Sequence, residues 1–282
     1  MPRSANAADA GCESLAFFFA VGPLLILLHL GDWLELATVL WGYYHVFKQH
    51  YGFMMMYKKK NRDFKPVGMK LDKAFFAAGF YFPFLICPLH DKEAAALLPF
   101  PIIPRLASIY ENVLLFALIR IALVYFVRQV QKWREGLPLN WPKQLLFACA
   151  HPVNYLLFRI GMPLLGVYAA VTIYHNVRYH RLVWFYNRNK YGQDAQGARN
   201  YGLATLISGR WLTYVAAAAL NAIIFDVIPR FVLPEGVGLM NVGTRNHIIF
   251  SFFAAPGLLH YWIDGHIWKV RSDPNLRTYL HL

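Results

Sequence analysis

Charged residues are scarce in this chain, and so are cysteines. Only 15% of the 282 residues are charged, whereas 57% are hydrophobic and 17% are aromatic. Soluble domains usually carry about a quarter charged residues, so the composition is typical of a membrane protein. The three cysteines, Cys12, Cys87 and Cys149, lie far apart without a CxxC pair. Neither a disulfide framework nor a thiolate metal site is therefore predicted.

Two further absences narrow the class of protein. No GxGxxG fingerprint of a dinucleotide site is present, so any electrons that a reaction needs must come from another protein. The net charge is +13, but the basic residues do not form a patch with interleaved stacking aromatics, so nucleic acid is not an expected partner. No small-residue cleavage site closes the first apolar run, which is typical of a retained span.

The sequence has few charged residues but several long apolar segments. A bilayer is crossed by about 20 apolar residues, and eight segments approach that length, with prolines and glycines at most of the joints between them. We expect an all-α, polytopic transmembrane helical bundle of about eight spans, forming one integral-membrane domain over residues 1–282 behind a polar tail at 1–14. The segments are 15–30, 33–48, 74–89, 109–127, 144–158, 163–184, 211–228 and 247–268.

The lysines and arginines indicate the orientation of these spans. With eight spans the joints alternate between the two sides, and 22 of the 28 basic residues then fall on one side. The positive-inside rule makes that side cytoplasmic. We expect a multi-pass protein of the inner or plasma membrane with both termini in the cytoplasm.

Histidines concentrate near the cytoplasmic ends of the expected spans. Polar groups at membrane depth are costly and usually face a protein interior, and imidazole is the commonest metal ligand among side chains. Asp264 follows His260 by one helical turn, so the two share a face. Ligation by nitrogen and oxygen alone favours iron over zinc, copper or manganese. The expected metal ligands are His45, His50, His151, His175, His180, His260, Asp264 and His266.

Two of these pairs have a spacing that a regular helix does not bring to one point. His45 and His50, like His175 and His180, are five residues apart, or about 140° around a helix. Either the helix deforms, the pair contacts two metal ions, or only one histidine of each pair is a ligand.

The order of the histidine motifs resembles that of histidine-rich integral-membrane non-haem iron oxygenases. The motifs are "LLHLGDW", "YHVFKQHYG", "YHNVRYH" and "LHYWIDGHIW". Their layout is similar to that of the bacterial Brp/Blh-type carotene dioxygenases and, more distantly, to the fatty-acid desaturase and hydroxylase superfamily, whose HxxxH and HxxHH boxes do not occur here. The resemblance implies oxygen activation by membrane-bound iron acting on a lipophilic substrate.

The leading hypothesis is a membrane-embedded non-haem iron oxidoreductase, with one or two iron ions, that hydroxylates, desaturates or cleaves a lipophilic substrate. Two alternatives remain: a transporter or scaffold in which the histidines relay protons, and a bis-histidine haem protein. The basic segment Lys58, Lys59, Lys60 and Arg62 is a candidate docking site for an acidic electron-donor protein. Its other interpretation is a topology signal in contact with anionic membrane lipid.

Overall fold

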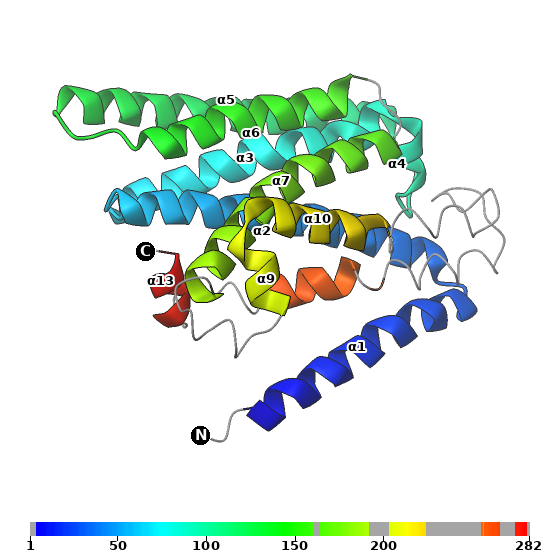
Figure 1. Ribbon diagram of the computed structural model, residues 1–282. Coiled ribbons are helices and arrows are strands. Elements are labelled where there is room, and N and C mark those ends of the chain that lie inside the picture. Colours follow the sequence, from blue (N-terminus) through cyan, green and yellow to red (C-terminus); the bar gives the residue numbers. More distant parts are fainter. Residues whose placement is uncertain are drawn as a thin grey trace. The chain divides into compact units, whose positions relative to one another are not determined.

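The computed structural model describes residues 4–160, 164–191, 203–223, 255, 257–265 and 274–280. Within these residues all regular structure is helical and no strand occurs, which confirms the all-α class (Figure 1). The helices are α1 (Ser4–Leu27), α2 (Gly31–Lys60), α3 (Pro66–His90), α4 (Lys92–Ala96), α5 (Pro104–Arg134), α6 (Trp141–Arg159), α7 (Leu164–Tyr191), α9 (Leu203–Gly209), α10 (Trp211–Ala222) and α13 (Pro274–Tyr279).

The chain divides into two compact units. Unit 1 consists of residues 1–42 and 176–282, and unit 2 of residues 43–175. Helices α2 and α7 each contribute residues to both units, because the divisions fall at Gly42 and His175. Unit 2 thus contains most of α2, all of α3 to α6 and the first part of α7.

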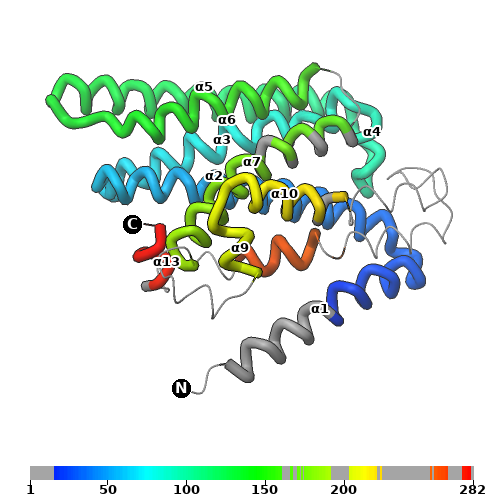
Figure 2. The backbone as a smooth tube through the Cα atoms, viewed as in Figure 1, coloured from blue at the N-terminus to red at the C-terminus, as the bar shows by residue number. Residues whose placement is uncertain are grey.

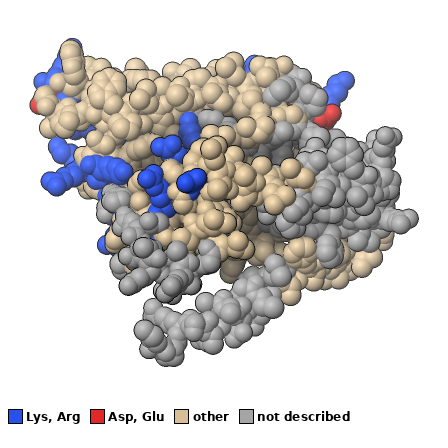
Figure 3. All heavy atoms as spheres, viewed as in Figure 1, with Lys and Arg blue, Asp and Glu red and all other residues tan. Residues whose placement is uncertain are grey.

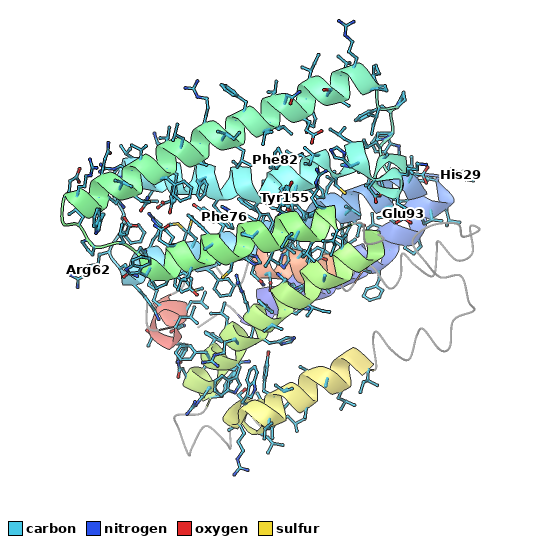
Figure 4. All side chains as sticks on the ribbon, turned by 90° about the horizontal axis from the view of Figure 1, so that it is seen from above. His29, Arg62, Phe76, Phe82, Glu93 and Tyr155 are labelled. Atoms are coloured by element: carbon cyan, nitrogen blue, oxygen red, sulfur yellow. The ribbon has the colours of Figure 1, made fainter. Side chains whose placement is uncertain are left out.

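Aromatic side chains fill the core of unit 2. Helix α3 packs against both α5 and α6, and its Phe76 is completely buried. The Phe76 ring stacks on Phe147 of α6 at 5.5 Å between centroids and on Phe47 of α2 at 5.4 Å. Offset and edge-to-face contacts of this kind add to the apolar area that the rings bury. They fix the three helices around one centre, where Phe76 is labelled in Figure 4.

A polar point lies inside this core close to Pro83 of α3. Pro83 has no N–H, so the carbonyl of Gly79, four residues before it, lacks its regular helix hydrogen bond. Close by, the carbonyl of Phe80 accepts hydrogen bonds from the Tyr43 hydroxyl and, at 2.7 Å, from the Asn154 amide. The Asn154 amide also donates to the Tyr43 hydroxyl oxygen. Three helices are therefore joined at a buried site by hydrogen bonds between the Tyr43 hydroxyl, the Asn154 amide and the Phe80 carbonyl.

Helix ends in unit 2 are set by residues in the left-handed region. Arg62 has a φ of 51°, and the Asp63 N–H bonds the Lys58 carbonyl, which is the six-to-one bond of a Schellman motif. Gly136 has a φ of 68° and ends α5 in the same way. The chain then turns tightly and returns as α6, antiparallel to α5 (Figure 2).

Among the described residues, two helices, α3 and α5, are long and apolar enough to cross a membrane. A third span results if α9 and α10, which are bent by 116° at their junction, count as one. The length and composition of these helices are compatible with the predicted membrane association, while about eight spans and the orientation of the termini stay predictions. The eighth expected segment lies mostly outside the described residues, although 257–265 is helical.

Several helices are longer than the apolar segments that predicted them. Helix α2 continues to Lys60 and α7 to Tyr191, so His45, His50, His175 and His180 do not end their helices as expected. The apolar run stops where polar residues begin, but lysine, arginine and tyrosine are compatible with a helix and prolong it. Apolar pattern alone therefore located these helices and missed their C-terminal ends.

Unit 1 has a small aromatic core of its own. Phe18 of α1 packs with Ala255 and Leu258, and its ring lies 5.9 Å from Trp41 of α2 and 6.5 Å from Trp262. The packing brings the described C-terminal residues 257–265 against α1 and the start of α2. It thereby positions the two predicted ligands of that segment, His260 and Asp264.

Candidate metal centre

In unit 2 the structure brings together two of the predicted ligands, His45 and His175. They come from the middle parts of α2 and α7, and they are only 7% and 4% exposed. Their ring centroids are 5.1 Å apart with an edge-to-face orientation, and each ring offers a nitrogen within 4.8 Å of a nitrogen of the other. Two buried imidazoles from helices far apart in the sequence can thus serve as neighbouring ligands.

Gln49 lies one turn after His45 on α2, so the two side chains share a face. Its amide oxygen and nitrogen are both buried, and neither has a hydrogen-bond partner in the described part of the chain. A buried amide without partners is costly and rare in native proteins. The donor set of two imidazoles with an adjacent unsatisfied amide therefore fits a bound polar ligand or metal.

His50 points to a different neighbour from His45. It is fully buried, its Nδ1 donates to the Val46 carbonyl at 2.8 Å, and its ring packs on Phe80 of α3 at 5.6 Å. His45 instead contacts α7. The two side chains therefore point in different directions, as their separation of about 140° around the helix requires. Of the three alternatives stated above, ligation by only one histidine of the pair fits this geometry best.

His151, another expected ligand, lies in an aromatic cage on α6. Its ring contacts Phe75, Phe76 and Phe147, with centroids 5.0, 5.8 and 5.6 Å away. Gly79 of α3 gives the ring its space, because a Cβ at that position would approach ring atoms to 2.7 Å. The described contacts of His151 are with these residues and not with His45 or His175, so the structure does not group it with that pair.

In unit 1 the segment 257–265 presents His260 and Asp264 on one face. The His260 Nε2 is 3.6 Å from the Asp264 Oδ2, as their spacing of one turn predicts. The Tyr179 hydroxyl of α7 donates to the Asp264 Oδ1 at 2.7 Å, and the Tyr179 ring packs edge to face on His260 at 5.5 Å. A tyrosine of α7 thus orients both of these predicted ligands.

A second tyrosine of unit 1 orients His180. The His180 Nδ1 is 2.9 Å from the Tyr214 hydroxyl of α10. With its proton on Nδ1, the ring donates to the tyrosine oxygen, and the Nε2 lone pair is then directed elsewhere as a potential ligand. Metal-binding histidines characteristically hold their second ring nitrogen by such a hydrogen bond. His180 and the His260–Asp264 pair are thus each held by a tyrosine, and their donor atoms are imidazole nitrogens and a carboxylate oxygen.

His266, the last expected ligand, lies outside the described residues.

Sequence reasoning did not find Tyr179 and Tyr214, because tyrosines near the end of an apolar helix resemble the ordinary aromatic belt of a membrane interface. The sequence contained one signal for Tyr179, which follows His175 by one helical turn.

The basic segment differs from the prediction at Lys58. This ammonium is completely buried and is ion-paired with Asp72 and with Asp63, so it cannot belong to a docking surface. Lys60 and Arg62 are exposed and Lys59 is half-buried. Basic side chains do gather at the end of unit 2 where α2 leads into α3 (Figure 3).

Lys58 belongs to a network that also contains Lys132 and Lys143. The Lys143 Nζ is 2.9 Å from Asp72 and 3.1 Å from Asp63, and the Lys132 Nζ is 3.0 Å from Asp63. Burial raises the pKa of Asp63, but the three ammonium groups around it outweigh burial and hold that pKa well below its usual range. Sequence analysis missed this network, because its members are spread over four helices and a loop.

Comparisons of the chain with protein-family models, with curated proteins and with solved structures found no match. The likeness to membrane iron oxygenases therefore rests on the order of the histidine motifs alone.

Proposed function

We propose that this chain is a membrane-embedded oxidoreductase that holds one or two non-haem iron ions and oxidises a lipophilic substrate. The observation that carries the proposal is the pairing of buried or tyrosine-bonded histidines within each unit. His45 contacts His175 in unit 2, and His180, His260 and Asp264 are oriented by tyrosines in unit 1.

The chemistry of the donor set supports iron over other metals. All the groups are imidazoles or a carboxylate, and no described thiolate lies among them. Such a set suits non-haem iron, which can supply redox chemistry with dioxygen when bound. The chain's own residues then have defined tasks: the histidines bind, the tyrosine hydroxyls hold the ligands of unit 1 in orientation, and burial of His45 and His175 excludes water from that pair.

The surroundings support a lipophilic substrate. The helices are apolar on most of their surface, and a long apolar substrate partitions into the same environment. The basic residues Lys59, Lys60 and Arg62 remain available to an acidic electron donor, whose encounter they would accelerate by long-range attraction. Contact with anionic lipid is the other role open to them.

Iron quantitation on the purified full-length chain tests the proposal directly. We expect one or two iron atoms per chain and no Soret band. Haem at one equivalent with a strong Soret band would establish the bis-histidine haem alternative instead. A chain that folds and binds no stoichiometric metal would contradict the proposal and favour a non-catalytic role for the histidines.

Variants of the predicted ligands provide the first specific prediction. His180→Ala and His260→Ala are each expected to lower bound iron to half or less and to abolish turnover, because each removes a ligand without emptying the aromatic core. Iron content and the midpoint of thermal unfolding in mild detergent are measured together. His90→Ala is the matched control, since His90 is an exposed histidine that bonds Glu111. Unchanged iron in both ligand variants would disprove the site.

A further inference from the structure

Helix α5 packs on one side and is open on the other. Its buried residues Tyr125 and Lys132 face the rest of unit 2, where α5 packs against α3. The opposite side is a row of apolar residues that are between 47% and 61% exposed. This open face of α5 consists of Ile109, Val113, Phe116, Val124 and Val127. In Figures 1 and 4, α5 forms the outer edge of the helices of unit 2.

Arg120 occupies the centre of the open face. It lies one turn from Phe116 and from Val124, and two turns from Val113 and Val127, so all of them point the same way. Arg120 is exposed, and its guanidinium lies over the Phe116 ring, 5.6 Å from the centroid. It is the only charged residue between Asn112 and Val127.

The depth of Arg120 makes its exposure significant. Helix α5 is one of the two helices that are long and apolar enough to cross a membrane. At 1.5 Å per residue, Arg120 is about 24 Å from the start of the helix and about 21 Å from its end. A headgroup layer lies about 15 Å from the midplane, which is farther than one side chain extends. With α5 centred on the bilayer, the guanidinium therefore stays below the headgroup layer even when the side chain extends along the helix.

No described carboxylate of this chain neutralises Arg120. The nearest acidic residue on α5 is Glu111, which lies on the opposite side of the helix and bonds the His90 Nε2 at 3.0 Å. Contact with the Phe116 ring compensates only part of the cost of a charge in hydrocarbon. An acidic group from outside the described residues would therefore stabilise an arginine in this position.

We propose that the open face of α5 binds a membrane-spanning helix of another protein that carries a carboxylate at mid-depth. A guanidinium and a carboxylate form two parallel hydrogen bonds, and such a pair is strong where water is absent. Valines and Phe116 around it would pack against the partner helix. A symmetric pair of copies of this chain fits less well, because equivalent faces would bring two arginines together.

The test uses the purified full-length chain in phosphatidylcholine nanodiscs and a fluorescent probe peptide. The probe is a leucine-alanine transmembrane helix with one central glutamate, and the matched probe has glutamine there. We expect the glutamate peptide to bind at least tenfold more tightly than the glutamine peptide, as measured by energy transfer. Arg120→Leu should remove this difference, and Arg120→Lys should retain part of it.

Arg128→Leu is the control, because Arg128 lies near the end of the same helix and interacts with Glu135 at the surface. It should leave the preference for the glutamate peptide unchanged. Equal binding of the two peptides to the unmodified chain would overturn the proposal. So would energy transfer between two labelled copies of the chain that Arg120→Leu abolishes, since the face would then bind a second copy.

Discussion

Single tyrosine hydroxyls decide how the predicted ligands of unit 1 are oriented. Tyr179 donates to Asp264, and Tyr214 bonds the Nδ1 of His180. A ligand held by such a bond is preorganised, because it does not lose rotational freedom when a metal binds. On the proposed function, the hydroxyls therefore matter for metal affinity although they contribute no ligand of their own.

Removal of one hydroxyl should weaken metal binding without unfolding the chain. We expect Tyr179→Phe and Tyr214→Phe each to lower iron affinity by about 10- to 100-fold, because the ring remains while the orienting hydrogen bond is lost. Competition with a chelator measures the affinity. Tyr44→Phe is the control, since Tyr44 is 49% exposed on α2. Identical chelator curves for all three variants would show that neither hydroxyl orients a ligand.

Gly79 and His151 pack so closely that position 79 has no room for a side chain. A Cβ on Gly79 would come within 2.7 Å of the His151 ring, which aromatic rings confine on three sides. We expect Gly79→Ala to lower the free energy of unfolding by about 1 to 3 kcal/mol through overpacking. Denaturant unfolding in mild detergent measures the change.

Two further variants make this prediction specific. Gly52→Ala should be neutral or stabilising by up to about 1 kcal/mol, because Gly52 is helical and its Cβ would meet nothing. In the Gly79→Ala/His151→Ala double variant, the cost should be smaller than the sum of the single costs. Additive costs would mean that the two residues do not collide.

The candidate ligands show what residue patterns can and cannot predict. The one-turn spacing of His260 and Asp264 is local and was readable from the sequence, as their 3.6 Å separation confirms. The contact of His45 with His175 depends on the packing of two helices whose positions along the chain are far apart. For that reason spacing could nominate these two histidines, but it could not separate them from His50 or His151.

At the scale of elements, buried ion pairs link the ends of four helices in unit 2. Asp63 follows α2 and Asp72 lies in α3, while Lys132 lies in the last turn of α5 and Lys143 in the first turn of α6. The Schellman motif at Arg62 directs the chain so that Asp63 meets the three lysines. Such pairs are costly to bury, but removal of one partner is costlier still because it leaves an unpaired charge.

Neutralisation of Asp72 should therefore destabilise unit 2. Asp72 is 2% exposed and pairs with Lys58 and Lys143, so Asp72→Asn is expected to lower the free energy of unfolding by about 3 to 5 kcal/mol. Glu135→Gln is the control, because Glu135 forms a half-exposed ion pair with Arg128 that is worth about 0 to 1 kcal/mol. If both variants lowered the free energy of unfolding equally, the buried network would contribute no more to stability than a half-exposed ion pair.

The same network predicts a loss of stability in acid. The pKa of Asp63 is lower in the folded chain than its ordinary value of 3.8. Its contribution is therefore complete at pH values above about 4 and decreases as the pH falls below that value towards the folded pKa. Unfolding midpoints between pH 7 and pH 2 measure this decrease, and in Asp63→Asn the decrease should be smaller.

For the whole molecule, composition predicted the helical class and the membrane character, because both follow from the scarcity of charge and the length of the apolar runs. It did not predict where the helices end. Helix α2 runs on through Lys58, whose charge is satisfied by two aspartates that follow it in the chain. The sequence alone thus suggests that Lys58 is a topology signal, whereas in the structure it is a buried residue that stabilises the fold.

The orientation of the chain in the membrane is a prediction about the whole molecule, and the two ends of unit 2 show which residues should lie on opposite sides. Arg62 and Glu93 lie at opposite ends of unit 2 in Figure 4, and α3, with 25 residues, separates them. At 1.5 Å per residue this helix is about 37 Å long, which exceeds the hydrocarbon core of about 30 Å. The basic end should be cytoplasmic, because lysine and arginine are retained on that side.

Reporter fusions in intact cells measure this arrangement. A fusion at Asp91, which directly follows α3, should read as extracytoplasmic, and so should one at Glu235 if the eight-span alternation holds. A fusion at Gly136, in the turn between α5 and α6, should read as cytoplasmic. If Asp91 and Gly136 read on the same side, α5 does not cross the membrane, because it is the candidate span that lies between them. Arg120 would then need no membrane partner, so this result bears on the proposed docking face as well.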